Sequence, residues 1–338
     1  MRIHAFTVGR DGCFHYRIRQ PLRALRRIGH WTSWGCGVDF ETWDRADVLI
    51  GAYMSHPQTR DDWLRWCAAG EKLCVWDADD NVFTAYTNAR HGAAYDDPST
   101  LPRMREMISA SHLVTVTTPE LAEVYRAINP HVVVLRNCVP DWLIDRAVNR
   151  STARPLILGY AASQSHAQDF VDWSPVLTRW MRKHLSETRF RLIGHDQRPE
   201  NWPSAWPIDL IPWHDQTDEY LASLDMDVAI APLSPSPFNA GKSGIKAQEA
   251  AALGIPMVAQ DWPQYRDVIV DGETGFIART HGEWLRAFER LWSDDAFRID
   301  MGLRAREYAR ANFLQGDNAW RWAAAYQDGI ERIGARNG

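Results

Sequence analysis

The sequence has few cysteines and no long apolar run, and both absences narrow the class of protein. Its 338 residues include five widely spaced cysteines with no CxxC pair, namely Cys13, Cys36, Cys67, Cys74 and Cys138. This odd, scattered set indicates neither a zinc site nor a disulfide framework. No segment is long and apolar enough to span a membrane, and the N-terminal apolar run is too short for a signal peptide. We therefore expect a reduced, soluble, cytoplasmic protein without a membrane span.

The chain also lacks a strong excess of either charge. Its net charge is −5, with 45% hydrophobic and 24% charged residues. These values are typical of a globular protein and give no support for a general nucleic-acid binder. The seventeen tryptophans are an unusually high number. We expect most of them in the core, with one or two lining a ligand cleft.

Apolar runs alternate with helix-like segments along most of the chain, which favours parallel sheets covered on both faces. The expected strands are residues 2–8, 47–53, 71–76, 112–118, 131–137, 156–163, 190–195, 209–213, 227–233 and 256–261. The alternation breaks near residue 150 and then restarts. We therefore expect an α/β protein with an N-terminal Rossmann-like domain at 1–148, a second at 149–313, and a C-terminal helix at 314–338. Ligands of such domains bind at the carboxyl ends of the strands.

The tripeptide Gly241-Lys242-Ser243 matches the end of a phosphate-binding P-loop, G-x-x-x-x-G-K-[ST]. The first glycine of that motif would fall at Ser236, and two nearby prolines, Pro235 and Pro237, remove amide donors from the loop. The sequence therefore argues against a magnesium-dependent P-loop ATPase.

The same stretch predicts a helix from about Ser243 to Gly254 that follows a strand. Free amides at its start and the charge of Lys242 would attract a phosphate. Glu249 lies on the same side as Lys246, where its carboxylate can accept two hydrogen bonds from a ribose diol. On spacing alone, a surface helix with a weak Lys246–Glu249 pair fits equally well.

Residues 242–278 resemble the donor-binding region of the group 1 glycosyltransferases, also called family four, which have the GT-B fold. The resemblance rests on Glu249 in its helix, on "AALGIPMVAQD" and on "DGETG" at 271–275. Weaker similarity extends over "LILGYAASQSHAQDF" and "LDMDVAIAPL". The N-terminal "DGCFHYRIRQPLRAL" and "VWDADDNVF" resemble a branch found in bacteria and phages.

The resemblance implies two Rossmann-like αβ domains facing a central cleft, with the C-terminal helix crossing back to the first domain. It implies a hexosyltransferase (EC 2.4 class) that moves a sugar from a UDP- or GDP-sugar to an acceptor, retaining and without a metal or other cofactor. We expect Lys242, Asp79 and Asp80 to be catalytic. The expected donor-binding residues are Gly12, Ser163, His166, Trp213, Asn239, Gly241, Lys242, Ser243, Gly244, Lys246 and Glu249.

This chain departs from the family pattern at two places. The first of two paired glutamates would fall at Gly241, so Asn239 or a backbone amide is a candidate to replace it. The arginine and lysine that many relatives carry after the first strand of the second domain are absent, and "AASQSHAQD" stands there instead. Ser163 and His166 are candidates to contact the diphosphate, although His166 fits a helix-start residue bonded to backbone equally well. Trp213 is either a base-stacking residue or, preferably, a core residue.

The triplet Asp77-Ala78-Asp79 allows an alternative, a GT-A enzyme that holds a metal through the D-x-D carboxylates. In the GT-B interpretation, Asp79 and Asp80 either hydrogen-bond an acceptor or cap the turn at Asn81. We expect the segment 9–17 to form a loop after the first strand, in which Gly12 allows close backbone approach.

The run of arginines between Arg10 and Arg27 surrounds Tyr16, and most of these arginines are expected to be solvated. We expect Tyr16, Arg17 and Asp80 to bind the acceptor, which is left open as a glycan, a small molecule or a modified DNA base. A phage-type DNA-base glycosyltransferase is therefore one alternative. A degenerate, non-catalytic GT-B binding module is another, and the expected assembly is a monomer or a dimer.

Overall fold

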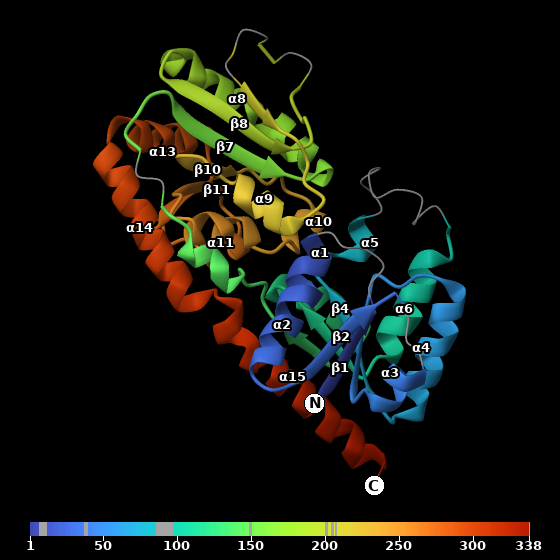
Figure 1. Cartoon of the computed structure of the whole chain (residues 1–338). Coiled ribbons are helices and arrows are strands. Elements are labelled where there is room, and N and C mark those ends of the chain that lie inside the picture. The colour runs from blue at the N-terminus through green and yellow to red at the C-terminus, as the bar shows by residue number, and fades with distance from the viewer. Residues whose placement is uncertain are drawn as a thin grey trace. The chain divides into compact units, whose positions relative to one another are not determined.

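The computed structural model describes residues 1–6, 12–36, 40–85, 97–148, 151–199, 202–203, 206 and 208–337. Residues 9–11 of the loop expected at 9–17 lie outside these ranges. The chain divides into two units. The first comprises Met1–Cys138, Ala240–Ser243 and Gln315–Gly338, and the second comprises Val139–Asn239 and Gly244–Leu314. Each unit is an αβ layer structure built on its own parallel sheet (Figure 1).

The first unit contains a six-stranded parallel sheet in the order β2-β1-β3-β4-β5-β6. Its strands are β1 (Arg2–Phe6), β2 (Trp31–Gly35), β3 (Val48–Ala52), β4 (Leu73–Ala78), β5 (Leu113–Val116) and β6 (Val132–Val134). Its helices are α1 (Gly12–Phe14), the π-helix η1 (His15–Arg19), α2 (Gln20–Arg27), α3 (Phe40–Arg45), α4 (Pro57–Ala69), α5 (Val82–Ala85), α6 (Thr100–Ala110), α7 (Pro119–Arg126) and α15 (Gln315–Asn337).

Both faces of this sheet are buried by helices, as expected for parallel strands that are apolar on both sides. On one face, Leu22 of α2 and Trp322 of α15 belong to a cluster with alternate residues of β1, β3 and β4. On the other face, Trp63 of α4, Met107 of α6 and Leu121 of α7 pack against the remaining strand residues. The C-terminal helix α15 therefore completes the core of the first unit.

The second unit contains another six-stranded parallel sheet, in the order β12-β11-β10-β7-β8-β9. Its strands are β7 (Leu156–Ala162), β8 (Thr188–Gly194), β9 (Ile208–Ile211), β10 (Val228–Ala231), β11 (Met257–Gln260) and β12 (Gly275–Ala278). Its helices are η3 (Asp141–Asp145), η4 (Gln164–His166), α8 (Ala167–His184), α9 (Thr217–Ser223), α10 (Pro237–Ala240), α11 (Ile245–Ala252), α12 (Pro263–Arg266), α13 (His281–Ser293) and α14 (Asp295–Asn312).

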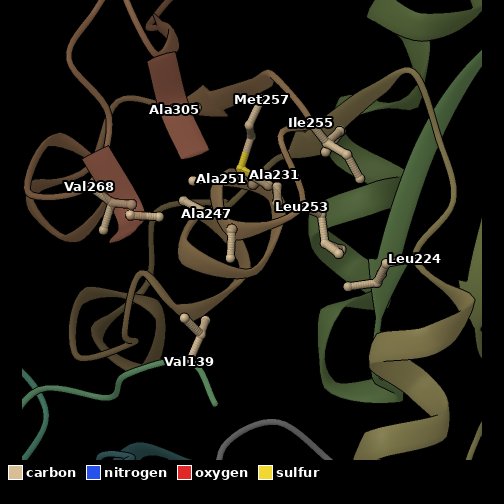
Figure 2. Close-up of a cluster of buried hydrophobic side chains, with 14 of the residues drawn as sticks. Val139, Leu224, Ala231, Ala247, Ala251, Leu253, Ile255, Met257, Val268 and Ala305 are labelled. Carbon is tan, nitrogen blue, oxygen red and sulfur yellow. The ribbon is translucent and has the colours of Figure 1, made fainter. Parts of the chain in front are cut away.

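The strand β10 shows how this second sheet is covered on both faces. Val228 and Ile230 pack with the aromatic side chains of α8 and α13, among them Trp173 and Trp284. The alternate residues face a cluster of small side chains from α11 and α14, part of which Figure 2 shows around Ala247, Ala251 and Ala305. Small side chains on α11 let this helix lie close to the sheet, which places the loop before it firmly.

The strand orders fix where a ligand site is expected in each unit. The order of the second sheet reverses between β7 and β10, and that of the first sheet reverses between β1 and β3. Loops that leave neighbouring strands on opposite sides open a crevice at such a switch point, outside the carboxyl ends of the strands. In the second unit, these are the loops that follow Ala162 and Ala231.

The expected pair of αβ domains is confirmed, with several differences in detail. The edge strand β2 and the strand β12 were not predicted, because "WTSWG" and "GFIA" carry no long apolar run. The helix expected from about Ser243 begins at Ile245 instead. Part of the loop expected at 9–17 is also helical, since residues 12–27 form consecutive turns of α1, η1 and α2.

Among the described residues, no helix is long and apolar enough to cross a membrane.

Candidate functional site

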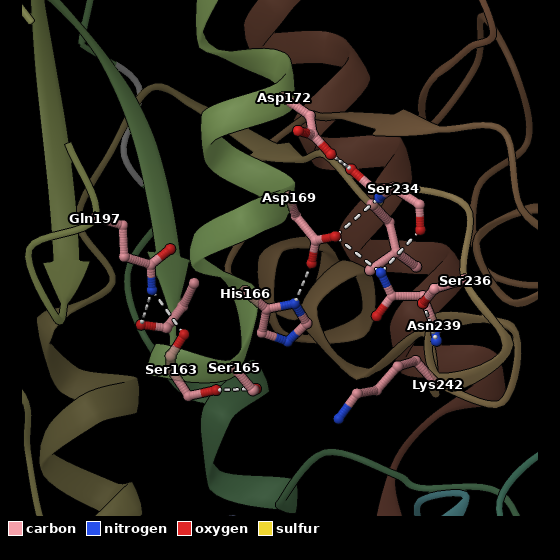
Figure 3. Close-up of polar contacts among 12 residues, drawn as sticks. Ser163, Ser165, His166, Asp169, Asp172, Gln197, Ser234, Ser236, Asn239 and Lys242 are labelled. Atoms are coloured by element: carbon pink, nitrogen blue, oxygen red, sulfur yellow. Dashed lines mark hydrogen bonds and ion pairs between the residues drawn. The ribbon is translucent and has the colours of Figure 1, made fainter. Parts of the chain in front are cut away.

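The switch point of the second sheet carries a buried polar cluster centred on Asp169, in the first turn of α8 (Figure 3). Its carboxylate accepts from His166 Nδ1 at 2.8 Å, from the Ser234 amide at 2.9 Å and from Asn239 Nδ2 at 2.8 Å. Asp169 is only 3% exposed. A carboxylate at this depth is tolerated because several donors satisfy it. The loops after β7 and β10 are thus joined by one side chain.

His166 is the residue that precedes α8, yet its side chain makes no capping hydrogen bond to the helix. The ring instead points to Asp169, as Figure 3 shows. His166 thus occupies the expected helix-start position, but its side chain bonds Asp169 in place of a capping hydrogen bond. Beside it, Ser163 Oγ lies 2.9 Å from Ser165 Oγ, and Gln197 Nε2 donates to the Ser163 carbonyl at 2.6 Å.

Helix α11 holds Lys246 and Glu249, both expected at the donor site. Lys246 Nζ lies 5.4 Å from the ring centroid of Tyr160, and the Tyr220 hydroxyl donates to Glu249 Oε2 at 2.9 Å. Burial, followed by the charge of Glu249, raises the pKa of Tyr220 well above its ordinary value. Tyr220 therefore stays a hydrogen-bond donor at neutral pH. A small pocket beside this pair is lined by Lys246, Glu249, Tyr220 and the apolar residues around Met226.

Gly244 lies immediately before α11, and its surroundings leave no room for a side chain at this position. A Cβ atom there would stand 2.4 Å from the carbonyl oxygen of Gln264. The Gln264 side chain in turn donates to the Asn239 carbonyl at 3.1 Å. The start of α11 is thereby packed directly against α12.

Trp213 is not a core residue, contrary to the preferred expectation. It follows β9, is 43% exposed and stacks on His195, with ring centroids 5.2 Å apart and an interplanar angle of 20°. His195 follows β8, so the two rings come from the carboxyl ends of adjacent strands. An exposed, stacked aromatic pair offers a flat surface to another ring.

The first unit gathers acidic groups after β4. Lys242 Nζ lies 2.8 Å from Asp80 Oδ1, and the Tyr53 hydroxyl donates to Asp79. Burial, followed by the charge of Asp80, raises the pKa of Asp79 to about 6. Burial alone would lower the pKa of Lys242, but the nearby carboxylate of Asp80 raises it. Lys242 is therefore a firmly protonated cation.

Tyr53 holds its hydroxyl on Asp79 from an unusual backbone conformation, with φ of 53°. A left-handed conformation costs a residue with a side chain roughly 1–2 kcal/mol, and such strain often occurs at functional sites. The alternative that Asp79 and Asp80 cap the turn at Asn81 is not supported, because their carboxylates accept from Tyr53 and Lys242. The Asn81 side chain accepts from the Phe83 amide at 3.2 Å.

The remaining residues of the P-loop-like tripeptide have partners in the first unit. The Gly241 carbonyl accepts from Thr118 Oγ1 at 3.3 Å, and Asn137 Nδ2 donates to Ser243 Oγ at 3.1 Å. Gly12, expected at the donor site, begins α1, and a Cβ atom there would meet no other atom within 4 Å.

Arg17 does not face a ligand, contrary to the expectation that it binds an acceptor. It is 2% exposed and forms a bidentate pair with Asp77 at 2.9 and 2.8 Å. Its guanidinium carbon also lies 4.7 Å from the ring centroid of Trp322. Tyr16 is buried in the same helix but has no part in this ion pair, so its expected role at the acceptor stays a prediction.

The pairing of Asp77 also removes the main support for a D-x-D metal site. Its two carboxylate oxygens accept from Arg17, and Oδ2 accepts from Thr115 Oγ1 at 2.6 Å. Asp77 is 1% exposed. A carboxylate with this geometry is a structural anchor between β4, β5 and η1, so the GT-A interpretation is not supported.

Asp169, Tyr220 and Tyr53 are among the residues of these clusters that were not singled out from the sequence. Asp169 stands three residues after His166, a spacing at which one helical turn brings two side chains together. That spacing was an available signal. Tyr220 and Tyr53 are far in sequence from Glu249 and Asp79, and only the tertiary fold brings each pair together.

Comparison with known proteins shows what part of the second unit resembles in sequence. Residues 157–294 match the sequence profile described as "Glycosyl transferases group 1". A D-inositol 3-phosphate glycosyltransferase of Corynebacterium diphtheriae is 42% identical over 84 residues, which are 24% of this chain and 18% of that protein. The match thus spans about a fifth of the length of the curated relative.

Solved structures resemble almost the whole chain. The catalytic domain of starch synthase IV from Arabidopsis thaliana, bound to ADP and acarbose, superimposes with a TM-score of 0.68 at 12% identity, covering 97% of this chain and 99% of that one. Anabaena HepE in complex with UDP and glucose gives a TM-score of 0.65 at 12% identity, covering 97% and 100%. The two αβ units therefore form the GT-B fold, which confirms the expected fold class.

Proposed function

We propose that this protein transfers a sugar from a nucleoside-diphosphate sugar to an acceptor, because residues 157–294 match the sequence profile of the group 1 glycosyl transferases. The observation that carries the proposal is the group of polar side chains and helix starts at the switch point of the second sheet. Two helices, α8 and α11, start beside this point, and Glu249 follows in α11. Amides at helix starts attract a diphosphate.

Each part of a sugar nucleotide has a candidate partner in this unit. Glu249 is fixed by Tyr220 through Oε2, and its carboxylate is the candidate acceptor for the ribose hydroxyls. His166 directly precedes α8 and Ser163 follows β7, and both are candidates to contact the diphosphate. The exposed Trp213–His195 stack is the candidate platform for the base. Neighbouring structures of this fold were solved with UDP or ADP, which supports a nucleotide ligand.

The chemistry requires that negative charge on the departing diphosphate be stabilised. Lys242, with its raised pKa, is a permanent cation suited to this role, and Asp80 is the group that holds it. Asp79 is half-titrated near pH 6 and is suited to exchange a proton with an acceptor hydroxyl. Retention of configuration and independence from metal ions remain part of the proposal, as do the roles of these three residues.

A panel of sugar nucleotides tests the donor site. We expect one of UDP-, GDP-, ADP- or dTDP-glucose, in EDTA, to raise the melting temperature by a few degrees, because a ligand that binds only the folded state stabilises it. Glu249→Ala should abolish that shift. Glu219→Ala is the matched control, because Glu219 is exposed on the neighbouring helix α9 and should leave the shift intact. A shift with ATP and magnesium alone would contradict the proposal.

The structure favours no second function. The buried pair of Arg17 with Asp77 removes one arginine from the basic rim on which the interpretation of a DNA-base acceptor depended. A non-catalytic binding module would bind the sugar nucleotide without turnover, so release of the nucleoside diphosphate distinguishes it from an enzyme.

A further inference from the structure

The carboxylate of Asp169 is the shared acceptor for two groups at the switch point, His166 and Asn239. Oδ2 receives the proton of His166 Nδ1, while Oδ1 receives those of Asn239 Nδ2 and the Ser234 amide. All of these residues lie in the second unit. Asp169 was not among the residues expected at the donor site.

These contacts fix the orientation of the Asn239 amide. Its nitrogen donates to Asp169 Oδ1 and to the Ser234 carbonyl, both at 2.8 Å. Both neighbours are acceptors, so only the NH₂ end of the amide fits between them. No described residue donates a hydrogen bond to Asn239 Oδ1. The side chain therefore offers its oxygen, an acceptor, to a ligand.

Asn239 lies two residues before Gly241, the position at which the family pattern has a glutamate carboxylate. A sugar hydroxyl needs an acceptor for its proton, and an amide oxygen supplies one without a charge. Asn239 alone would be free to turn either end outward. The buried carboxylate and the Ser234 carbonyl hold it in one of the two orientations.

The same carboxylate determines which nitrogen of His166 carries a proton. Because Nδ1 faces a carboxylate at 2.8 Å, Nδ1 must be protonated, whether the ring is neutral or charged. A proton added to the ring therefore enters at Nε2. The arginine and lysine of the family pattern are absent here, so the resulting imidazolium is suited to meet the diphosphate.

We propose that Asp169 is a positioning residue of the donor site, which keeps His166 protonated at Nδ1 and turns the oxygen of Asn239 toward the donor sugar. This proposal rests on the proposed function, because it assigns the ligand of both groups as a nucleoside-diphosphate sugar.

The variant Asp169→Asn separates the effect on the protonation of His166 from the effect on the orientation of the Asn239 amide. The oxygen of the introduced amide can still accept from Ser234 and Asn239, while its NH₂ faces His166 and cannot accept a proton from Nδ1. The neutral ring must then carry its proton on Nε2. Asp172→Asn is the matched control, since Asp172 lies one turn later, accepts from Ser234 Oγ at 2.6 Å and holds the same segment.

The first readout is the tautomer of His166 without any ligand. Long-range ¹H–¹⁵N spectra of protein labelled at its twelve histidines report it, and His166→Gln identifies the signal. We expect a proton on Nδ1 in the wild type and in Asp172→Asn, and a neutral ring protonated on Nε2 in Asp169→Asn. A wild-type ring protonated on Nε2 alone, or no change in Asp169→Asn, would overturn the positioning of His166.

The second readout is calorimetric affinity for UDP-glucose and for UDP, or for the GDP pair if the panel selects that base. Asn239→Ala should weaken the affinity for the sugar nucleotide roughly tenfold, because one hydrogen bond to the sugar is lost. The affinity for the plain nucleoside diphosphate should stay within about twofold of the wild-type value. Asp169→Asn should weaken the affinity for both ligands about tenfold, and Asp172→Asn should change neither affinity. Equal losses of both ligands in Asn239→Ala would overturn the assignment of its oxygen to the sugar.

The two proposals fail in different ways. A wild type that binds no nucleoside diphosphate would refute the proposed function and the ligand assignment together, with the tautomer result unchanged. A wild type that binds the donor normally, with Asp169→Asn equal to it in both affinities, would refute only the role of Asp169.

Discussion

At the scale of single residues, Asp79 shows how burial and a neighbouring charge change a group's chemistry. Its ordinary pKa is 3.8, and in the folded chain burial and Asp80 raise it to about 6. The folded state therefore binds this proton more tightly than the unfolded state. The ionised carboxyl lowers stability above about pH 6, and the loss disappears as the pH falls toward 4.

We predict that Asp79→Asn raises the melting temperature at about pH 8 and that this gain vanishes at about pH 4, because the neutral amide replaces an unfavourable charge only at high pH. Differential scanning calorimetry at both pH values measures it. Asp80→Asn is the control and should lower the melting temperature at pH 8, since it leaves Lys242 without its partner carboxylate. An equal effect of Asp79→Asn at both pH values would contradict the assignment.

Arg17 illustrates a buried ion pair whose loss is costly. Replacing Arg17 by Met leaves Asp77 buried without its bidentate partner, so we expect a loss of about 3–5 kcal/mol in unfolding free energy. Urea denaturation measures this loss. Arg23→Met, on the exposed side of α2, should change stability by less than about 0.5 kcal/mol. Similar results for both variants would show that the pair has no structural role.

Residue types and spacing were enough to single out Glu249, His166 and Lys242 as candidates. They were not enough to assign Arg17, because exposed and buried arginines look alike in a sequence. The burial of Arg17 depends on Asp77, Leu135 and Asn137, which are distant in the chain. Partners of that kind become visible only when the sheet is assembled.

At the scale of elements, the packing of α14 against the end of α11 depends on a glycine. A Cβ atom at Gly302 would lie 2.1 Å from the carbonyl oxygen of Gly254, in the turn that ends α11. Backbone cannot move aside cheaply, so the two elements touch only because Gly302 has no side chain. The helix that carries Glu249 is held in place by this contact.

We predict that Gly302→Ala lowers the unfolding free energy by about 1–3 kcal/mol, despite the better helix propensity of alanine. Gly334→Ala in α15 is the matched control, because a Cβ atom there meets nothing within 4 Å. It should be neutral or stabilising by up to about 1 kcal/mol. Chemical denaturation of both variants gives the comparison, and a stabilising Gly302→Ala would contradict this packing.

Elements with strong apolar runs, such as β4 and β10, were predictable from the sequence. The strand β2 was not, because it lies at the sheet edge, where partial exposure permits the polar and aromatic sequence "WTSWG". The start of α11 was misplaced by two residues, since Gly244 is fixed by contact with α12 rather than by a local capping signal.

At the scale of the whole molecule, strand order carries the functional argument. The alternation of strands and helices predicts parallel sheets, but it does not say which strands are neighbours. The order β12-β11-β10-β7-β8-β9 brings the loops after β7 and β10 together, and with them His166, Asp169 and Asn239. The family resemblance supplied the fold, and the sheet order explains physically why these loops meet.

The central claim is that this chain transfers sugar from a nucleoside-diphosphate sugar, and release of the diphosphate tests it most directly. The four sugar nucleotides are incubated with the protein in EDTA, and free UDP, GDP, ADP and dTDP are quantified by chromatography. We expect water to serve as a slow acceptor when no other is present. We predict release of one nucleoside diphosphate by the wild type and by Glu219→Ala, and none by Glu249→Ala. Binding of a sugar nucleotide without any release would contradict the enzyme and leave a binding module in its place.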